Sequence, residues 1–197
     1  MSFISKRAIR CLGIAESFVR SEGVSILAGV VMRGDLIVDG ITFTKISLGG
    51  LDATDGVIRI YENLDRSDIN LVMIGGAIIA LYNIIDLEKV YHHLKIPIIC
   101  VTYRRSEGIE ENLRRLPKAN KRVEIYRRLG DRREIVLKTG YRVFVRWYGL
   151  REREVTTLLN RFTRFGRVPE PIRVARLCAR AILKFILRMN LKKCGVG

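Results

Sequence analysis

Features that would assign the chain to several common classes of protein are missing from the sequence. The four cysteines lie far apart and form no Cys-x-x-Cys pair or Cys/His zinc-ligand spacing, so they indicate neither a zinc site nor a disulfide framework. No apolar run reaches about 18 residues without a charge, the length that a transmembrane helix needs. Because residues 1–7 lack the apolar stretch of a signal peptide, we expect a cytoplasmic protein without a membrane partner.

Negative charge is scarce in the second half of the chain. Residues 1–99 carry 10 Lys and Arg against 11 Asp and Glu, whereas residues 100–197 carry 26 against 9, and the net charge is +16. A half this basic predicts a polyanionic partner, because phosphate contacts release counterions and so supply affinity. We expect nucleic acid. A solvated, highly charged surface and an anionic membrane remain the alternatives.

The length of 197 residues, with 48% apolar and 28% charged residues, is typical of one globular domain. No internal repeat or low-complexity linker divides the chain, so we expect a single domain over residues 1–197. The oligomeric state is left open.

The first 50 residues predict three consecutive strands. Two apolar runs, 9–15 and 23–32, are followed by a tight turn at 33–35 and a third run at 36–47. Strands joined by such short links form an antiparallel meander.

After the Gly49-Gly50 pair, helices and strands alternate. We first expect a helix that opens at 52–55 and has apolar positions up to Leu64, a buried strand at 69–74, a second helix from the Gly75-Gly76 turn to about 94, and a buried strand at 96–103. Helices at 107–116 and 121–129, a strand at 136–148, and helices at 151–161 and from Pro169-Glu-Pro171 to about 189 should follow. Three antiparallel strands followed by parallel βα units are the order of a ribonuclease H-like α/β fold, a mixed sheet flanked by helices with a basic helical C-terminal part.

This order predicts that four strands end at one edge of the sheet. Their ends carry Glu16, the pair Asp52 and Asp55, Gly75, and the pair Arg104 and Arg105. Carboxylates bind divalent metal, and a glycine turn and a basic strand end beside them can hold a phosphodiester against it. Glu16, Asp52 and Asp55 are therefore candidate catalytic residues and ligands of Mg²⁺ or Mn²⁺. Either aspartate could instead only cap the following helix.

Further polar residues are candidates for contact with nucleic acid. These are Arg104, Arg105, Arg114, Arg115 and Asn83, which follows the fourth strand and could reach the cleft. Trp147 and Tyr148 could stack on a base, although packing in the core or an interface is the alternative. The adjacent residues His92 and His93 cannot share one helix face, which favours a surface position.

Together, five motifs resemble the archaeal family called endonuclease dU, a distant relative of endonuclease V. They are Gly29-Val-Val-Met-Arg-Gly34, Val38-Asp-Gly40, Gly50-Leu-Asp-Ala-Thr-Asp55, Asn83-Ile-Ile-Asp86 and Val168-Pro-Glu-Pro-Ile-Arg-Val-Ala175. The resemblance spans about residues 8–185. It implies a ribonuclease H-like fold and metal-dependent cleavage of DNA near a deaminated base such as deoxyuridine. By position, Asp55 would stand nearer the place of the glutamate of endonuclease V, and Arg104 or Arg105 in the place of its lysine.

Two positions depart from the family pattern. Relatives usually read Gly-Ile-Asp-Asp where this chain reads Gly13-Ile-Ala-Glu16, and the third aspartate of endonuclease V aligns with Gly75. Because side chains alternate along a strand, Glu16 can replace the acid missing at Ala15 only if the strand has already ended or bent. The alternative hypothesis is therefore a protein that binds nucleic acid without cleaving it and retains a degenerate metal site.

Overall fold

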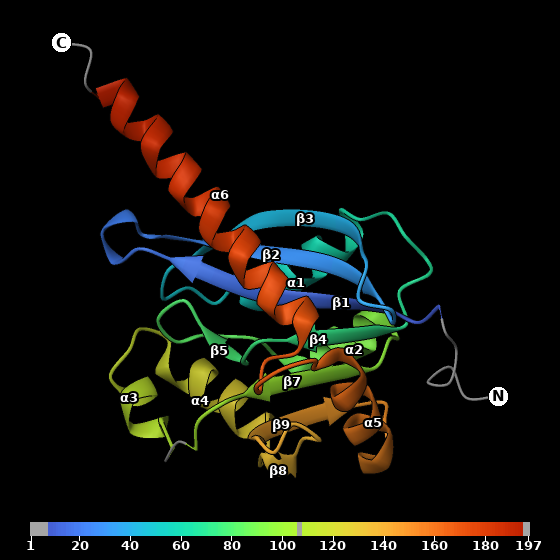
Figure 1. Ribbon diagram of the computed structural model, residues 1–197. Coiled ribbons are helices and arrows are strands. Elements are labelled where there is room, and N and C mark those ends of the chain that lie inside the picture. Colours follow the sequence, from blue (N-terminus) through green and yellow to red (C-terminus); the bar gives the residue numbers. More distant parts are fainter. Residues whose placement is uncertain (1–7, 106–107, 195–197) are drawn as a thin grey trace.

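The computed structural model describes residues 8–105 and 108–194, and its centre is a mixed β-sheet (Figure 1). Within these residues, seven strands form the sheet in the order β3-β2-β1-β4-β7-β9-β8. The strands are β1 (Arg10–Phe18), β2 (Val24–Arg33), β3 (Val38–Ser47), β4 (Leu71–Ile74), β7 (Ile98–Thr102), β8 (Arg133–Val136) and β9 (Arg142–Tyr148). A separate small hairpin pairs β5 (Ile78–Ile79) with β6 (Asn83–Ile84).

Helices connect these strands in the alternation that the sequence predicts. They are α1 (Ala53–Glu62), α2 (Leu87–Leu94), α3 (Glu110–Arg114), α4 (Ala119–Arg128), α5 (Glu152–Phe162) and α6 (Glu170–Cys194), with a 3-10 turn at Arg20–Glu22. No helix of the described ranges is both long and apolar enough to cross a membrane.

The directions of the strands confirm the predicted topology. β2 pairs with β1 and β3 in antiparallel fashion, which makes the expected meander, whereas β4 pairs with β1 and β7 in parallel fashion. The carboxyl ends of β1, β3, β4 and β7 therefore share one edge of the sheet, which we call the carboxyl edge. Because active sites of open α/β sheets lie outside such strand ends, this edge is where a site is expected.

The two faces of the sheet bury separate apolar clusters. On one face, α1, α2 and α4 cover residues such as Leu12, Ile14 and Val72. On the other face, α5 and α6 cover residues such as Cys11 and Met73, and α6 runs diagonally over β1 and β2 (Figure 1). The alternation of side chains along β1 therefore decides which helices each of its residues meets.

A glycine on β1 allows α6 to approach the sheet closely. A Cβ added at Gly13 would collide with the backbone of Pro171, in the first turn of α6. Backbone contact this close needs a residue without a side chain. The Gly13 position and the Pro169-Glu-Pro171 helix start, which are far apart in the sequence, are thus two sides of one packing contact.

Two secondary-structure predictions are wrong. Residues 77–86 were expected at the start of a helix, but they form the β5–β6 hairpin, and the helix begins only at Leu87. The single strand expected at 136–148 is instead a hairpin of β8 and β9, with Gly140 at φ 84° in its turn. In both segments a short apolar run satisfies more than one pattern, and only long-range pairing decides between them. Of the expected helix at 107–116, Glu107 lies outside the described residues.

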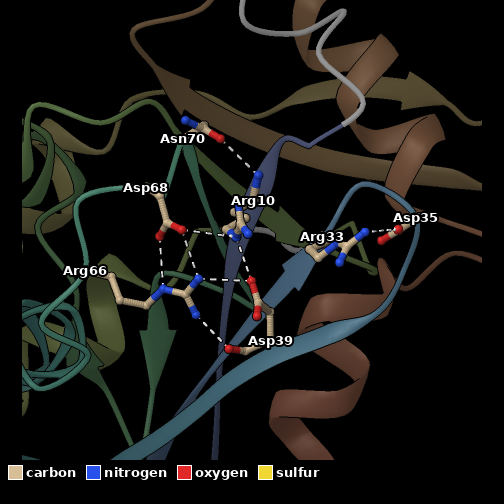
Figure 2. A network of polar contacts seen from close by, with 7 residues as sticks. All are labelled: Arg10, Arg33, Asp35, Asp39, Arg66, Asp68 and Asn70. Atoms are coloured by element: carbon tan, nitrogen blue, oxygen red, sulfur yellow. Dashed lines mark hydrogen bonds and ion pairs between the residues drawn. The ribbon is translucent and has the colours of Figure 1, made fainter.

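An ion-pair network fixes the opposite edge of the sheet, far from the carboxyl edge (Figure 2). The Arg10 Nε lies 2.6 Å from Asp39 Oδ2, and the same oxygen accepts a hydrogen bond from Arg66 Nη2 at 2.9 Å. Arg66 also pairs with Asp68, while the Asn70 side chain accepts the backbone N–H of Arg10. The network joins the first residue of β1, the start of β3 and the loop before β4.

Candidate functional site

Asp52 stands at the N-cap of α1, and its carboxylate is bonded on both oxygens. It accepts the backbone N–H and the hydroxyl of Ser47, both at 3.0 Å to Oδ2, and the amide of Asn83 at 2.6 Å to Oδ1. Burial opposes ionisation, but the hydrogen bonds from Asn83 and Ser47 outweigh it and lower the pKa of Asp52. The side chain therefore connects β3 to the β5–β6 hairpin, and both of its oxygens already accept hydrogen bonds.

Asn83 completes this tie from the hairpin. Its side chain is fully buried, its amide donates to the Ser47 carbonyl at 2.9 Å, and its oxygen accepts the Ala53 N–H at 3.0 Å. That last bond satisfies one of the free donors at the start of α1. The structure thus places Asn83 inside the protein rather than on a surface that a nucleic acid would touch, so we give it a positioning role.

Asp55 lies in the first turn of α1 and points to solvent. Its side chain is 56% exposed and forms an ion pair with Lys89 of α2 at 3.0 Å. Such an exposed pair contributes little to stability. Of the three candidate ligands, Asp55 is the one whose oxygens are most accessible.

Glu16 lies within β1, because the strand does not end at residue 15 but continues to Phe18. Ala15 therefore faces the α5 and α6 side, where it belongs to the apolar cluster, while Glu16 points to the other face and accepts the Ser25 hydroxyl at 3.2 Å. Burial raises the pKa of Glu16, although the Ser25 hydrogen bond and the charge of Arg176 act against this. Glu16 consequently does not replace the carboxylate absent at Ala15.

These carboxylates do not fit a divalent metal as the structure holds them. Within residues 8–105 and 108–194, no three Asp, Glu, His or Cys side chains are grouped closely enough to hold an ion. Asp52 already accepts three donors, Asp55 is paired with a lysine, and burial raises the pKa of Glu16. Hard cations require several ionised oxygens converging on one point, which this arrangement does not supply.

Positive charge, in contrast, gathers at the carboxyl edge. A pocket of about 460 Å³ opens beyond the ends of β4 and β7, and five arginines line it. We call it the arginine pocket. Its lining includes Arg104, Arg132, Arg146, Arg167, Arg176, Gly75, Tyr82, Tyr103 and Tyr126. Among the described residues of this lining, none carries a carboxylate.

Backbone carbonyls orient several of these guanidinium groups without neutralising them. Arg146 Nε donates to the Gly130 carbonyl at 2.8 Å, and Arg167 Nη1 donates to the Tyr103 carbonyl at 3.0 Å. The guanidinium carbons of Arg167 and Arg176 lie 6.0 Å and 5.8 Å from the centroid of the Tyr103 ring. Because a guanidinium has five donors, each group keeps others for an anion in the pocket.

Gly75 forms part of the pocket wall for a steric reason. A Cβ at this position would lie 2.9 Å from the Ile172 side chain of α6 and 3.6 Å from Arg176 Nη2. A side chain at residue 75 would therefore displace α6 or fill the space in front of Arg176. The glycine opens the pocket to the arginine.

The predicted arginines separate into two groups. Arg104 lines the arginine pocket, and Arg105 lines a neighbouring groove. Arg114 and Arg115, in contrast, lie on and just after α3, where they pair with Glu110 at 2.5 Å and Glu111 at 2.7 Å.

Four arginines of the pocket were missed by the reasoning from sequence. Arg132 and Arg146 were hidden in a segment that is basic throughout. Arg167 and Arg176 directly flank the motif at 168–175, and this position was a signal that could have indicated them.

Comparison with solved structures identifies the class of fold. The chain matches Ciona intestinalis endonuclease V, in complex with a 24mer DNA containing an inosine followed by a ribo-adenosine, with a TM-score of 0.64, 16% identity, and 94% and 90% of the two chains covered. It matches Streptomyces avermitilis endonuclease V with a TM-score of 0.62, 15% identity, and coverage of 94% and 84%. The protein therefore has the ribonuclease H-like fold of endonuclease V.

Sequence comparison then gives the family. The family model described as Endonuclease dU matches residues 7–183, and the chain belongs to this family. A UPF0215 protein of Pyrobaculum calidifontis is 35% identical over 181 residues, with 91% of this chain and 100% of the relative covered. A solved protein from Archaeoglobus fulgidus has a TM-score of 0.77 at 29% identity, with 89% and 98% of the chains covered. Membership of this family supports a nuclease.

Proposed function

We propose that the protein acts on DNA and holds a phosphodiester of the strand in the arginine pocket. The observation that carries this proposal is the convergence of five arginines, without a lining carboxylate among the described residues, at the carboxyl edge. Guanidinium groups form charge-assisted, often bidentate hydrogen bonds with phosphate oxygens. In a concave, partly dry site these bonds are stronger than on an open surface. Membership of the endonuclease dU family supports the same substrate class.

We further propose that the protein is an endonuclease that cleaves DNA near a deaminated base such as deoxyuridine. Support comes from the family and from the position of Glu16, Asp52 and Asp55 at the edge that also holds the pocket. Mg²⁺ and Mn²⁺ are the ions to supply, although the carboxylates as the structure holds them do not fit a metal. The residues of this chain bind and orient the phosphate, and the guanidinium groups of Arg167 and Arg176 both lie against the Tyr103 ring.

A second candidate function is binding without cleavage. The resemblance to the family and to endonuclease V implies acids at the positions of Ala15 and Gly75, and within residues 8–105 and 108–194 no cluster of ligating side chains replaces them. A guanidinium pocket binds a phosphodiester without hydrolysing it, since nothing in it activates water. The same protein surface would then protect or mark a strand instead of cutting it.

One experiment separates the two candidates. Matched oligonucleotides with and without deoxyuridine or deoxyinosine are incubated with the protein and Mg²⁺ or Mn²⁺, and both cleavage and binding are measured. We expect lesion-dependent cleavage, and we expect Arg176→Ala to weaken binding about tenfold, as one charged hydrogen-bond partner is worth. Arg153→Ala, at an exposed position of α5 outside the pocket lining, is the control of equal charge. Binding without cleavage under every condition establishes the second candidate, and full binding by Arg176→Ala contradicts the pocket.

A further inference from the structure

A basic groove adjoins the arginine pocket and shares part of its wall. This groove has a volume of about 880 Å³ and lies between α4, the turn at 130–132, β8 and β9. Tyr126, Arg132 and Arg146 line both hollows, so the two spaces are neighbours along one surface. Arg105 and Arg133 belong to the groove alone. A ligand longer than one nucleotide that enters the pocket therefore meets a second binding surface.

The groove carries excess positive charge where it joins the pocket. Arg146 is half-buried, and both its burial and the nearby charge of Arg132 lower its pKa. Five arginines line the groove, namely Arg105, Arg127, Arg132, Arg133 and Arg146. Two acids, Asp131 and Glu134, also line the groove, but Glu134 is paired with Arg142 at 3.0 Å. The charge balance thus favours a phosphate at the junction.

Aromatic rings accompany these charges. The ring of Phe144 is half-buried on β9, with the guanidinium carbon of Arg132 at 5.9 Å from its centroid. Tyr126 of α4 stands at the boundary of the two hollows. Surfaces that bind single-stranded nucleic acid combine cationic groups along the phosphate backbone with aromatic rings on which the bases stack. A paired base keeps its faces stacked within the duplex and cannot use such rings without being extruded.

We propose that the basic groove binds an unpaired stretch of the strand whose phosphodiester occupies the arginine pocket. The strand leaves the pocket past Arg132 and Arg146, and its next bases stack at Phe144 while Arg133 meets a phosphate. This inference rests on the proposed function. It adds that the substrate presents several unpaired nucleotides on one side of the bound phosphate, which family membership alone does not state.

The test compares short and long single strands by fluorescence anisotropy. With wild-type protein, a strand of about 12 nucleotides fills pocket and groove, whereas one of about 4 fills the pocket alone. We expect the double variant Arg133→Ala/Phe144→Leu to lower the affinity for the longer strand about tenfold and to leave the affinity for the shorter strand unchanged. The matched control is Arg153→Ala/Phe185→Leu, which removes the same groups from α5 and from the exposed end of α6. Arg133→Ala alone changes only an exposed residue, so it tests the groove even if the substitution of Phe144 prevents folding.

The outcomes separate this inference from the proposed function. Arg176→Ala is expected to lower the affinity for both the short and the long strand. If it does so while the groove variants bind the longer strand with unchanged affinity, the groove proposal is wrong and the pocket proposal stands. If Arg176→Ala leaves both strands unaffected, the pocket itself is wrong. Equal loss of affinity for a duplex and a single strand in the groove variants would overturn the assignment to unpaired nucleotides.

Discussion

Asp52 and Asp55 are separated by a single turn of helix, and their surroundings predict effects of different size for the same substitution. Asp52→Asn replaces an acceptor by an amide that opposes the donors of Asn83 and Ser47, so we expect a loss of about 1–3 kcal/mol in the free energy of unfolding. Asp55→Asn removes only an exposed ion pair and should change the free energy of unfolding by less than about 1 kcal/mol. Urea unfolding of the two variants measures both. Equal losses would show that the Asp52 bonds are not the tie that we describe.

Asp55 also distinguishes the two candidate functions at the level of a single carboxylate. If Asp55→Asn keeps its stability but no longer cleaves, the carboxylate acts in catalysis and is released from Lys89 when substrate binds. If cleavage by the variant equals that of the wild type, Asp55 is a surface residue only.

The individual residues of the site illustrate what reasoning from sequence could and could not reach. Glu16, Asp52, Asp55 and Arg104 were placed at one edge because strand order follows from local apolar patterns, and the strand directions confirm that edge. The partners of each side chain were not predictable. The bond from Asn83 to Asp52 joins residues 31 positions apart, and the choice between ligand and tie depends on it.

At the scale of elements, a buried arginine of α4 holds the strained connection between β5 and β6. Ala80, Leu81 and Tyr82 all have positive φ, between 43° and 67°, which costs energy in residues other than glycine. The guanidinium of Arg122 binds the carbonyls of Tyr82, Gly50 and Gly49 in this region.

Substitution of this arginine should loosen the wall of the arginine pocket, because Tyr82 lines it. Lysine cannot span several carbonyls with one point charge. We expect Arg122→Lys to lower the free energy of unfolding by about 2–3 kcal/mol, since buried acceptors lose their donors. Arg153→Lys, at an exposed position of α5, is the control. Calorimetry of the two variants is the measurement, and similar melting temperatures would show that the hairpin holds its conformation without the arginine.

The ion-pair network at the opposite edge joins β1 and β3, and it should make the stability of the protein depend on pH. Hydrogen bonds from Arg10 and Arg66 lower the pKa of Asp39, and those of Arg66 lower the pKa of Asp68. A carboxyl whose pKa is lower in the folded state stabilises the protein above its unfolded pKa, near 3.9, and this contribution is lost as the pH falls through the folded pKa.

The matching prediction concerns Asp39→Asn. The variant should melt below the wild type at neutral pH, and the difference should shrink as the pH falls below about 4. Melting curves across that range provide the measurement. A difference that stays constant with pH would show that Asp39 acts through neutral hydrogen bonds rather than its charge.

At the scale of the whole molecule, the net charge predicts affinity that depends on salt. If four or five arginine or lysine side chains neutralise phosphates of duplex DNA, log K should fall against log salt with a slope of about −4. Arg104→Ala/Arg105→Ala should make the slope less negative by about 1–2, because these residues line the two hollows. Arg114→Ala/Arg115→Ala, an equal change of charge at paired residues, should leave it nearly unchanged. A larger change of slope in the second variant would show that the DNA binds at α3 instead.

The charge of the second half was evident from composition, but its distribution was not. Arg122 is one of the cations of that half, yet it is buried and bonded to carbonyls, and Arg114 is paired along α3. The five arginines of the pocket come from positions 104 to 176 and meet only after the sheet and α6 have formed. Counting charges therefore indicated the partner, whereas locating it required the fold.

The helix α6 extends past the sheet that supports its first half (Figure 1). Ala179 and Leu183 still pack on β2, and the family match ends at residue 183, but Phe185 and Met189 are 65% and 45% exposed. Ile186 and Leu187 also pack against the cluster of Ala179 and Leu183, whereas the turns beyond Leu187 rely on their own backbone hydrogen bonds, which are marginal in water. The amide protons of these last turns should exchange with solvent faster than those of the first half, and the boundary between slow and fast exchange should fall near Leu187.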